Sequence, residues 1–206
     1  MLMGPYRNCY ERVYVFSPSC APGVDSAWDA WRKHVKVHMR VPDDEQTMWD
    51  TWDGGKKLEE LIERHKKVNQ YLKAKKQKKG YAICVIIDDW ADAGDKVMGS
   101  STNVLTSLFV RGRHTGCACW LLTQKTRVIS LVCRTNFCWM LIWRLRNGKE
   151  LEAIIEELDA LVDRKTLLEM YRMATADKHG FLFVNLLNER DQMFYKGFDQ
   201  RFVLSE

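Results

Sequence analysis

The chain has 206 residues, of which 46% are hydrophobic and 29% charged. This composition is typical of a globular domain and excludes disordered and fibrous proteins. No apolar run reaches the roughly 18–20 residues that a membrane span needs, and the N-terminal residues lack the order of a secretory signal. The net charge of +5 only weakly favours acidic partners. We therefore expect one soluble, intracellular domain over residues 1–206, and the sequence does not choose between nucleus, cytoplasm and virion.

The seven cysteines are an odd number, and several lie in apolar runs that predict buried strands. The chain has no CxxC pair. Cys117 and Cys119 come nearest to a ligand pair because they would share one face of a strand, but their spacing does not match the usual zinc patterns. We expect reduced thiols in the core and no structural zinc.

The N-terminal quarter predicts a strand over 12–17, which ends in a loop rich in proline and serine. Two short helical stretches are expected next, over 25–33 and around residues 49–52. Each places two tryptophans on one face, Trp28 with Trp31 and Trp49 with Trp52. Such pairs either pack in the core or form a surface on which bases or a partner stack.

A long helix is predicted over 56–79 because apolar residues recur there at helical spacing. Its acids, Glu59, Glu60 and Glu63, come early, whereas its last turns carry only basic residues: Lys73, Lys75, Lys76, Lys78 and Lys79. This basic end either complements the negative pole of the helix or lies against the phosphates of DNA.

The remaining elements alternate between strands and helices. Ser100 or Ser101 is expected to cap a helix that Gly112 ends. The predicted ranges are strands over 81–87, 117–123, 136–143 and 181–186, helices over 100–111, 151–162 and 167–173, and a hairpin or edge strand within 190–206. Unbroken apolar runs are typical of strands buried on both faces, so the pattern predicts an α/β fold with a parallel sheet between helices.

The polar residues that follow the predicted strands are the candidates for chemistry, because ligands of α/β sheets bind at the carboxyl ends of strands. Asp88 and Asp89 end one strand, and Gln124 follows the next. In nucleotide hydrolases, one such carboxylate holds Mg²⁺ and the second orients or deprotonates water. Paired acids alone are also a common way to end a buried strand. Their order with Gln124 and with Arg134, in the next connection, favours the catalytic interpretation.

Five segments carry a resemblance to a known family: 12–19 (RVYVFSPS), 85–89 (VIIDD), 108–114 (LFVRGRH), 121–124 (LLTQ) and 134–136 (RTN). They resemble the genome-packaging ATPases of large DNA viruses, the poxvirus-type branch of the FtsK/HerA superfamily. The resemblance covers roughly residues 8–150. It implies a P-loop NTPase-like three-layer sandwich with a mainly parallel central sheet.

The resemblance also implies roles for individual residues. Asp88 would be the Walker B acid that holds Mg²⁺, Asp89 the catalytic carboxylate, and Gln124 the sensor of ATP at the next strand end. Arg134, and also Arg111 or Arg113, would be candidates for an arginine offered to a neighbouring subunit. Arg111 and Arg113 have a simpler interpretation, as cations at a helix end. The implied partners are double-stranded DNA and further copies of the chain in a ring.

One departure from the family pattern concerns ATP binding. The 206 residues contain no GxxxxGK(S/T), the loop whose backbone N–H groups and lysine hold the phosphates. The expected fold therefore lacks the N-terminal P-loop strand. Either the chain is a piece of a longer protein, or it is a relative that keeps the fold without turnover. We expect an ATPase motor subunit of the DNA-packaging or translocation type that is inactive or impaired as this chain. The alternative is a non-catalytic remnant that binds nucleic acid or protein.

Overall fold

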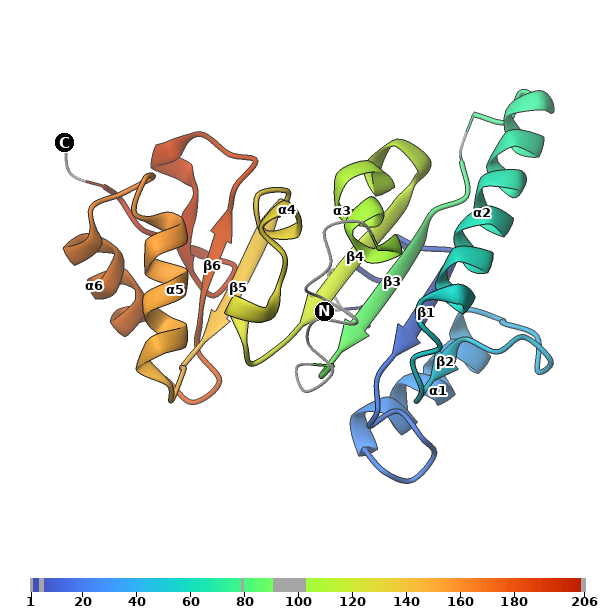
Figure 1. The fold of residues 1–206 in the computed structure, drawn as a ribbon, viewed down its shortest axis with the longest axis horizontal. Helices are drawn as coiled ribbons and strands as arrows, with labels where there is room; N and C mark the ends of the chain where they lie inside the picture. The colour runs from blue at the N-terminus through green and yellow to red at the C-terminus, as the bar shows by residue number, and fades with distance from the viewer. Residues whose placement is uncertain (1, 4–5, 79, 91–102, 205–206) are drawn as a thin grey trace. The chain divides into compact units, whose positions relative to one another are not determined.

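The computed structural model describes residues 2–3, 6–78, 80–90 and 103–204. Their contacts divide the chain into two compact units. The first consists of Met1–Gln124 and Val128–Cys133, and the second of Lys125–Arg127 and Arg134–Glu206. Figure 1 shows the elements of both in chain order.

The first unit is built on a parallel sheet with the strand order β2-β1-β3-β4. The strands are β1 (Arg12–Phe16), β2 (Met48–Trp49), β3 (Ile83–Asp88) and β4 (Cys117–Leu122). All three neighbouring pairs run parallel. The first five residues of β3 are buried, as expected for a strand covered on both faces. The predicted α/β class and its parallel sheet are confirmed.

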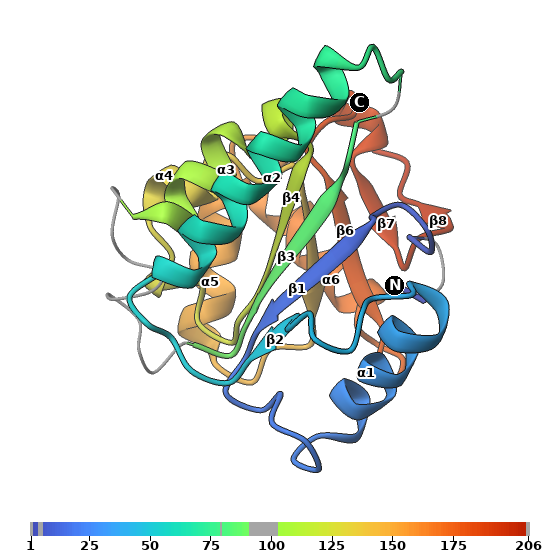
Figure 2. The ribbon, with the colours of Figure 1, turned by 90° about the vertical axis from the view of Figure 1, so that its right-hand side faces the viewer.

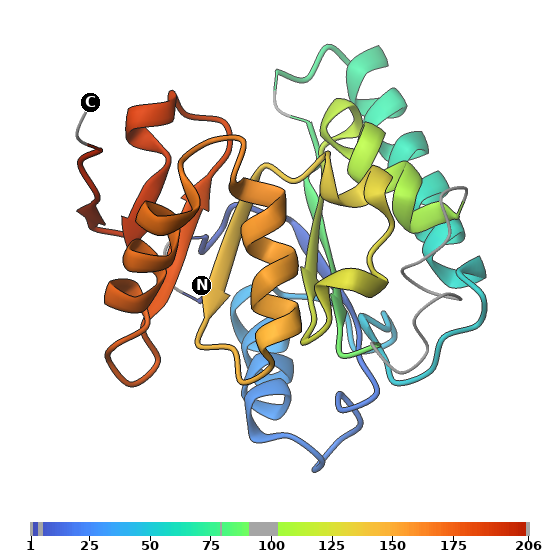
Figure 3. The same cartoon turned by 60° about the vertical axis from the view of Figure 1, so that its left-hand side comes forward.

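Helices cover both faces of this sheet, α2 (Lys56–Ala74) and α3 (Val104–Thr115) on one side and α1 (Ser26–His38) on the other (Figures 2 and 3). Side chains of β1 alternate between these layers. Tyr14 of β1 accepts a hydrogen bond from Arg64 of α2, whereas Asp88 at the end of β3 lies near Trp28 of α1. The helix predicted over 56–79 ends at Ala74, so the basic residues after it lie beyond its last turn.

Two local predictions about α3 are corrected. Gly112 does not end α3, which continues to Thr115 and ends at Gly116 with a φ of 70°. A Cβ atom on Gly112 would lie 2.4 Å from the carbonyl oxygen of Cys117, so glycine at this position permits close packing. Asn103 caps α3 by accepting from the Thr106 N–H, while Ser100 and Ser101 lie outside the described residues.

The segment around Trp49 and Trp52 is not helical. Trp49 belongs to β2, and its ring stacks on that of Phe16 at 4.9 Å. Trp52 follows a bend at residues 50–51 and contacts Phe16 edge-on at 5.6 Å. These rings pack against the end of β1, as the core-packing interpretation predicts.

One edge of the sheet is formed by β4. Gly116 O accepts a hydrogen bond from the Ile83 N–H, and Leu122 O accepts one from the Asp89 N–H. Because backbone groups alternate in direction along a strand, those of residues 117, 119 and 121 point away from β3. Among the described residues, no backbone partner faces the N–H and C=O groups of Cys119 and Leu121. As far as the structure describes this unit, the outer edge of β4 is therefore apolar and unpaired.

The second unit has an antiparallel sheet with the order β5-β6-β7-β8. Its core includes Ile142, Leu158, Leu167, Leu182 and Phe194. The strands are β5 (Trp139–Trp143), β6 (Phe181–Asn185), β7 (Phe194–Lys196) and β8 (Gln200–Arg201). Between them come α5 (Gly148–Leu158), α6 (Arg164–Ala174) and η3 (Arg190–Gln192). The chain reaches β5 through two short helices, η2 (Thr126–Val128) and α4 (Leu131–Arg134). The predicted C-terminal hairpin is confirmed.

The expectation that β5 would be another parallel strand is wrong. In the part of the chain that the structure describes, β5 pairs only with β6, and the pair is antiparallel. Only Ile142 of β5 is fully buried. A strand with one buried and one partly open face is typical of antiparallel sheets, whereas strands of parallel sheets are buried on both faces. The apolar run in the sequence did not distinguish these two kinds of strand.

Candidate functional site

The end of β3 brings the first predicted acid against the end of β1. The register pairs Phe16 with Ile87, so the next residues, Ser17 and Asp88, lie side by side. The Ser17 hydroxyl is buried and donates to Asp88 Oδ2 at 2.7 Å. The Trp28 side chain of α1 lies close enough to lower the pKa of Asp88. The hydrogen bond from Ser17 holds the Asp88 carboxylate in one orientation.

The surroundings of Asp88 disfavour its ionised form. Burial raises the pKa of this carboxyl, and the nearby charges of Asp89 and Asp25 raise it further. The hydrogen bond from Ser17 and the nearby Trp28 side chain lower the pKa, but they do not cancel the effect of burial. A carboxylate in this position would gain from a cation beside it.

Asp89 adopts a different conformation from its neighbour. Its φ of +54° lies in the left-handed region, which Asp tolerates better than most residues. Its N–H donates to Leu122 O at 3.2 Å, which extends the ladder between β3 and β4 by one bond. Its side chain is exposed. The paired acids thus differ in burial, with one anchored in the structure and the other open to solvent.

Tryptophan rings support the turn that follows the acids. The Trp90 Nε1–H donates to Phe16 O at 3.1 Å, which ties this turn to the end of β1. The Trp90 ring also lies 6.2 Å from that of Trp52. Sequence reasoning assigned no role to Ser17 or Trp90, and it considered Trp28 only as a core-packing or stacking residue. Ser17 could have been found, because it directly follows β1 as Asp88 ends β3.

Gln124 lies at the same edge of the sheet as the acids, as predicted. The register pairs Asp88 with Leu122, and Gln124 follows two residues later with an exposed side chain. In the described ranges, no hydrogen bond joins Gln124 to Asp88 or Asp89. The edge therefore presents two carboxylates and an amide from neighbouring strands.

The three candidate arginines are not part of this arrangement in the first unit. Arg134 belongs to the second unit, where its Nη1 lies 2.6 Å from Glu157 Oε2 in a largely buried ion pair. Arg111 and Arg113 are exposed near the end of α3, which leads through Gly116 into the amino end of β4. Within one chain, they lie at the opposite end of β4 from Gln124. Their assignment to a neighbouring subunit stays a prediction.

Within the described residues, no group of three or more His, Cys, Asp or Glu side chains is arranged to hold a metal ion. Mg²⁺ does not need such a group, because it is commonly bound by one or two carboxylates together with phosphates and water. The Asp88 carboxylate fits that pattern because it is oriented by Ser17 and has no ion-pair partner among the described residues. None of the described helices is long and apolar enough to cross a membrane.

Replacing Asp88 by Asn is expected to stabilise the fold at neutral pH. Because the pKa of Asp88 is raised in the folded chain, the native state loses stability as the pH rises from about 3.8 through that higher pKa. Asn cannot ionise, so its advantage should grow over this pH interval and stay constant above it. Urea unfolding at several pH values would measure this. Asp44→Asn, at an exposed turn, is the control, and a less stable Asp88→Asn chain at pH 7 would contradict the argument.

Comparison with known proteins identifies the family. The family model described as "Poxvirus A32 protein" matches residues 51–196, which is more than half of the chain. The chain belongs to the poxvirus A32 family. The resemblance found in the sequence is thereby confirmed, although the matched range begins after β1 and extends through most of the second unit. No curated protein sequence matches the chain significantly.

Solved structures support the fold of this A32 family member. The genome packaging NTPase B204 from Sulfolobus turreted icosahedral virus 2, in complex with AMP, superposes with a TM-score of 0.51 at 13% identity. The match covers 89% of this chain and 82% of B204. The same NTPase in complex with ATP-gammaS gives a TM-score of 0.48 at 13% identity over 85% and 92% of the two chains. The AMP complex, at this low identity, shows a shared fold and no more.

Proposed function

We propose that this A32 family member is an ATPase-type subunit of a DNA-packaging motor, and that the carboxyl edge of its parallel sheet is the Mg²⁺–nucleotide side of the site. Membership of the family and the packaging-NTPase fold support the class of activity. The single observation that carries the site is the half-buried Asp88, fixed by Ser17 and lying beside Asp89. This arrangement provides one oriented carboxylate and one solvent-exposed carboxylate at the end of a strand.

Each residue at the edge then has a distinct task. Asp88 binds Mg²⁺ directly or through water, and the ion, when bound, neutralises charge on the phosphates. Asp89, which is exposed, orients the attacking water and accepts its proton. Gln124 donates to the γ-phosphate or to that water. Ser17 holds Asp88 in place.

The arginine in this proposal comes from a neighbouring subunit of a homo-oligomeric ring. Arg111 and Arg113 are exposed and could reach across an interface, whereas Arg134 would first have to leave Glu157. An arginine supplied in this way can contribute about 10³–10⁵ in rate. Because the 206 residues lack GxxxxGK(S/T), we also propose that this chain alone hydrolyses ATP slowly or not at all.

Metal binding tests the site without requiring turnover. Mn²⁺, which replaces Mg²⁺ at oxygen ligands and can be followed by electron paramagnetic resonance, should bind the wild-type chain in the presence of ATP. Asp88→Asn is expected to lower the Mn²⁺ affinity by about tenfold or more, because it removes the charge of the one anchored ligand. Asp44→Asn should leave the affinity unchanged. Equal Mn²⁺ affinity in wild type and Asp88→Asn would exclude this edge as the metal site.

A second function, DNA binding that does not depend on hydrolysis, is favoured by the basic tail at the end of α2. We define the basic tail as Lys73, Lys75, Lys76 and Lys78, which are all exposed, while Lys79 lies outside the described residues. The Lys75 Nζ atom lies 5.7 Å from the ring centre of Tyr71, whose side chain is 62% exposed. No acid occurs between residues 64 and 80. Since α2 leads into the amino end of β3, the basic tail and Asp88 are at opposite ends of that strand.

Reversing the charge of the basic tail should weaken the binding of double-stranded DNA. Each phosphate contact contributes about 0.9 to the slope of log affinity against log salt. Replacing Lys75, Lys76 and Lys78 by Glu is therefore expected to reduce this slope by about 3 if all three contact phosphates. The matched control replaces three exposed lysines elsewhere, namely Lys33, Lys56 and Lys149. An equal loss in both triple variants would mean that net charge alone, and not the basic tail, determines binding.

A further inference from the structure

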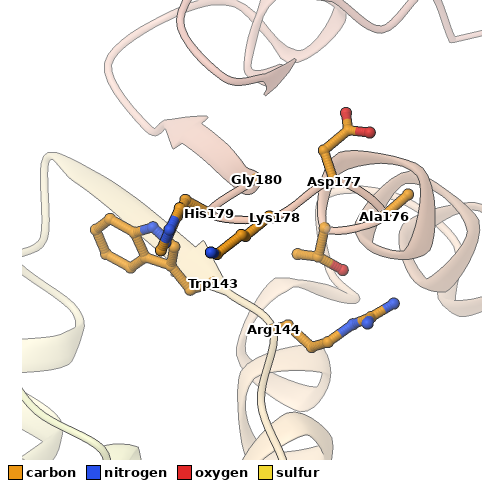
Figure 4. Close-up of a pocket in the computed structure, with 8 residues that line it drawn as sticks. Trp143, Arg144, Ala176, Asp177, Lys178, His179 and Gly180 are labelled. Atoms are coloured by element: carbon orange, nitrogen blue, oxygen red, sulfur yellow. The ribbon is translucent and has the colours of Figure 1, made fainter.

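The second unit contains a pocket that the proposed ATPase site does not use. It lies where β5 ends and where the loop after α6 enters β6, and its volume is about 500 Å³. Pockets that bind small ligands have volumes of about 300–1,000 Å³. The lining combines the indole of Trp143 with Arg144, Lys178 and His179. Figure 4 shows Trp143, Lys178 and His179 grouped on one side of this pocket.

The charge of the pocket is positive. Its one acidic residue, Asp177, is paired with Lys196 at 2.7 Å. Arg144 and Lys178 are exposed, and in the described part of the chain neither forms an ion pair. The loop that carries Lys178 is fixed, because the Gly180 N–H donates to Asp177 O at 3.0 Å and Gly180 packs closely on Ala174 O. Lys178 is thus presented to solvent on a fixed turn, while Arg144 directly follows the end of β5.

Trp143 provides an accessible ring that its neighbours hold in place. Its side chain is 49% exposed, and its ring lies 5.4 Å from that of Phe181 on the adjacent strand. From there a row of aromatic rings continues across the sheet at centroid distances of 5.1–5.7 Å. We call this the aromatic row, and it consists of Trp143, Phe181, Phe198, Phe183 and Tyr195.

The aromatic row lies on the face of the sheet that the core does not use. Side chains alternate along a strand, and the core of this unit takes Ile142 from β5 and Leu182 and Val184 from β6. Trp143 and Phe181 are paired in the register and belong to the opposite face. Phe198, farther along the row, is 39% exposed. An open aromatic face therefore continues from the cationic pocket.

We propose that this pocket binds one nucleotide of a single-stranded nucleic acid, with its base stacked on Trp143 and its phosphate held by Lys178. The strand then continues along the aromatic row. Proteins bind single strands by combining cations that follow the backbone with aromatic rings on which unpaired bases stack. A duplex cannot offer such bases, because they are already paired and stacked. This site is separate from the Mg²⁺ edge and from the basic tail, and it goes beyond the proposed ATPase activity.

Fluorescence anisotropy with a labelled oligothymidylate tests the proposal on the full chain. Trp143→Ala is expected to weaken binding by about 5- to 100-fold, the size of one lost stacking contact. Trp143→Phe should retain most of the affinity. Met173→Ala, at a 53% exposed apolar side chain of the same unit, should have no effect. Lys178→Gln should lower the salt slope by about 0.7, and Lys165→Gln should not change it.

Three results would overturn the proposal. The first is unchanged oligothymidylate binding in Trp143→Ala with a native circular-dichroism spectrum. The second is an equal loss of single-stranded and duplex binding in that variant, because stacking on Trp143 requires an unpaired base. The third is competition by thymidine monophosphate as strong as that by the oligonucleotide, which would assign the pocket to a free nucleotide instead. Loss of single-strand binding alone, with duplex binding intact, would support the proposal and is independent of any ATPase result.

Discussion

Replacing Asp89 by Asn is expected to lower Mg²⁺-dependent ATP hydrolysis by about 10²–10⁴-fold, or to the background of the assay, because a positioned general base contributes an effect of this size. The Asn side chain has a similar shape and tolerates the left-handed backbone of this position, where φ is +54°. Nucleotide binding should therefore persist while turnover is lost. Because the 206 residues lack GxxxxGK(S/T), phosphate release is measured, with and without DNA, on a longer chain that supplies this loop, and equilibrium binding of ATP measures the affinity.

The comparison with Asp88→Asn separates the roles of the paired acids. Loss of metal binding is expected in Asp88→Asn but not in Asp89→Asn, because only Asp88 is anchored by Ser17. Asp44→Asn again serves as the exposed control. Hydrolysis at the wild-type rate in Asp89→Asn would show that Asp89 is not the catalytic base. If the wild-type chain shows no measurable hydrolysis, metal binding and nucleotide binding are the measurements that test the site at the carboxyl edge of the sheet.

Gly112→Ala is expected to destabilise the first unit by roughly 1–3 kcal/mol or more, the usual cost of overpacking. The added Cβ would lie 2.4 Å from the carbonyl oxygen of Cys117, a backbone atom that cannot rotate away. The last turn of α3 or the start of β4 would have to move. Because β4 carries Gln124 at its other end, we expect the shift to reach the candidate site. Chemical denaturation with far-UV circular dichroism measures the loss.

Gly148→Ala is the matched control for that substitution. Gly148 is the first residue of α5, and a Cβ atom there would meet nothing within 4 Å. Its replacement should be neutral or stabilise the chain by up to about 1 kcal/mol, since alanine loses less entropy on folding than glycine. If both variants had the stability of the wild type, the close packing of α3 on β4 would not be a constraint on the fold.

The parallel sheet and the location of the paired acids could be predicted from sequence because both depend on local patterns. The run that ends in Asp88 is apolar over both faces, and buried parallel strands need that composition. Carboxyl ends of neighbouring parallel strands meet at one edge, so Gln124 and the acids had to lie at the same edge once the strands were recognised. The family assignment rested on motifs around the same residues and was confirmed by the A32 match.

Other features depended on partners that a linear pattern does not reveal. Gly112 is indistinguishable in sequence from a helix-ending glycine, and only the approach of Cys117 O explains it. The ion pair that holds Arg134 depends on Glu157, which is distant along the chain. The antiparallel pairing of β5 depended on β6, which follows two helices later. The pocket at Trp143 likewise combines residues from two separate segments.

The unpaired edge of β4 affects how the protein behaves at high concentration. Free N–H and C=O groups on an apolar strand are a template for pairing with another chain, so recovery of the folded protein after denaturation should fall as its concentration rises. The same template has a productive use. A strand added beside Cys119 and Leu121 would run next to the segment that ends in Gln124. In the function proposed above, filling this edge would also order the amide of Gln124, so that completion of the sheet would control the activity of the site.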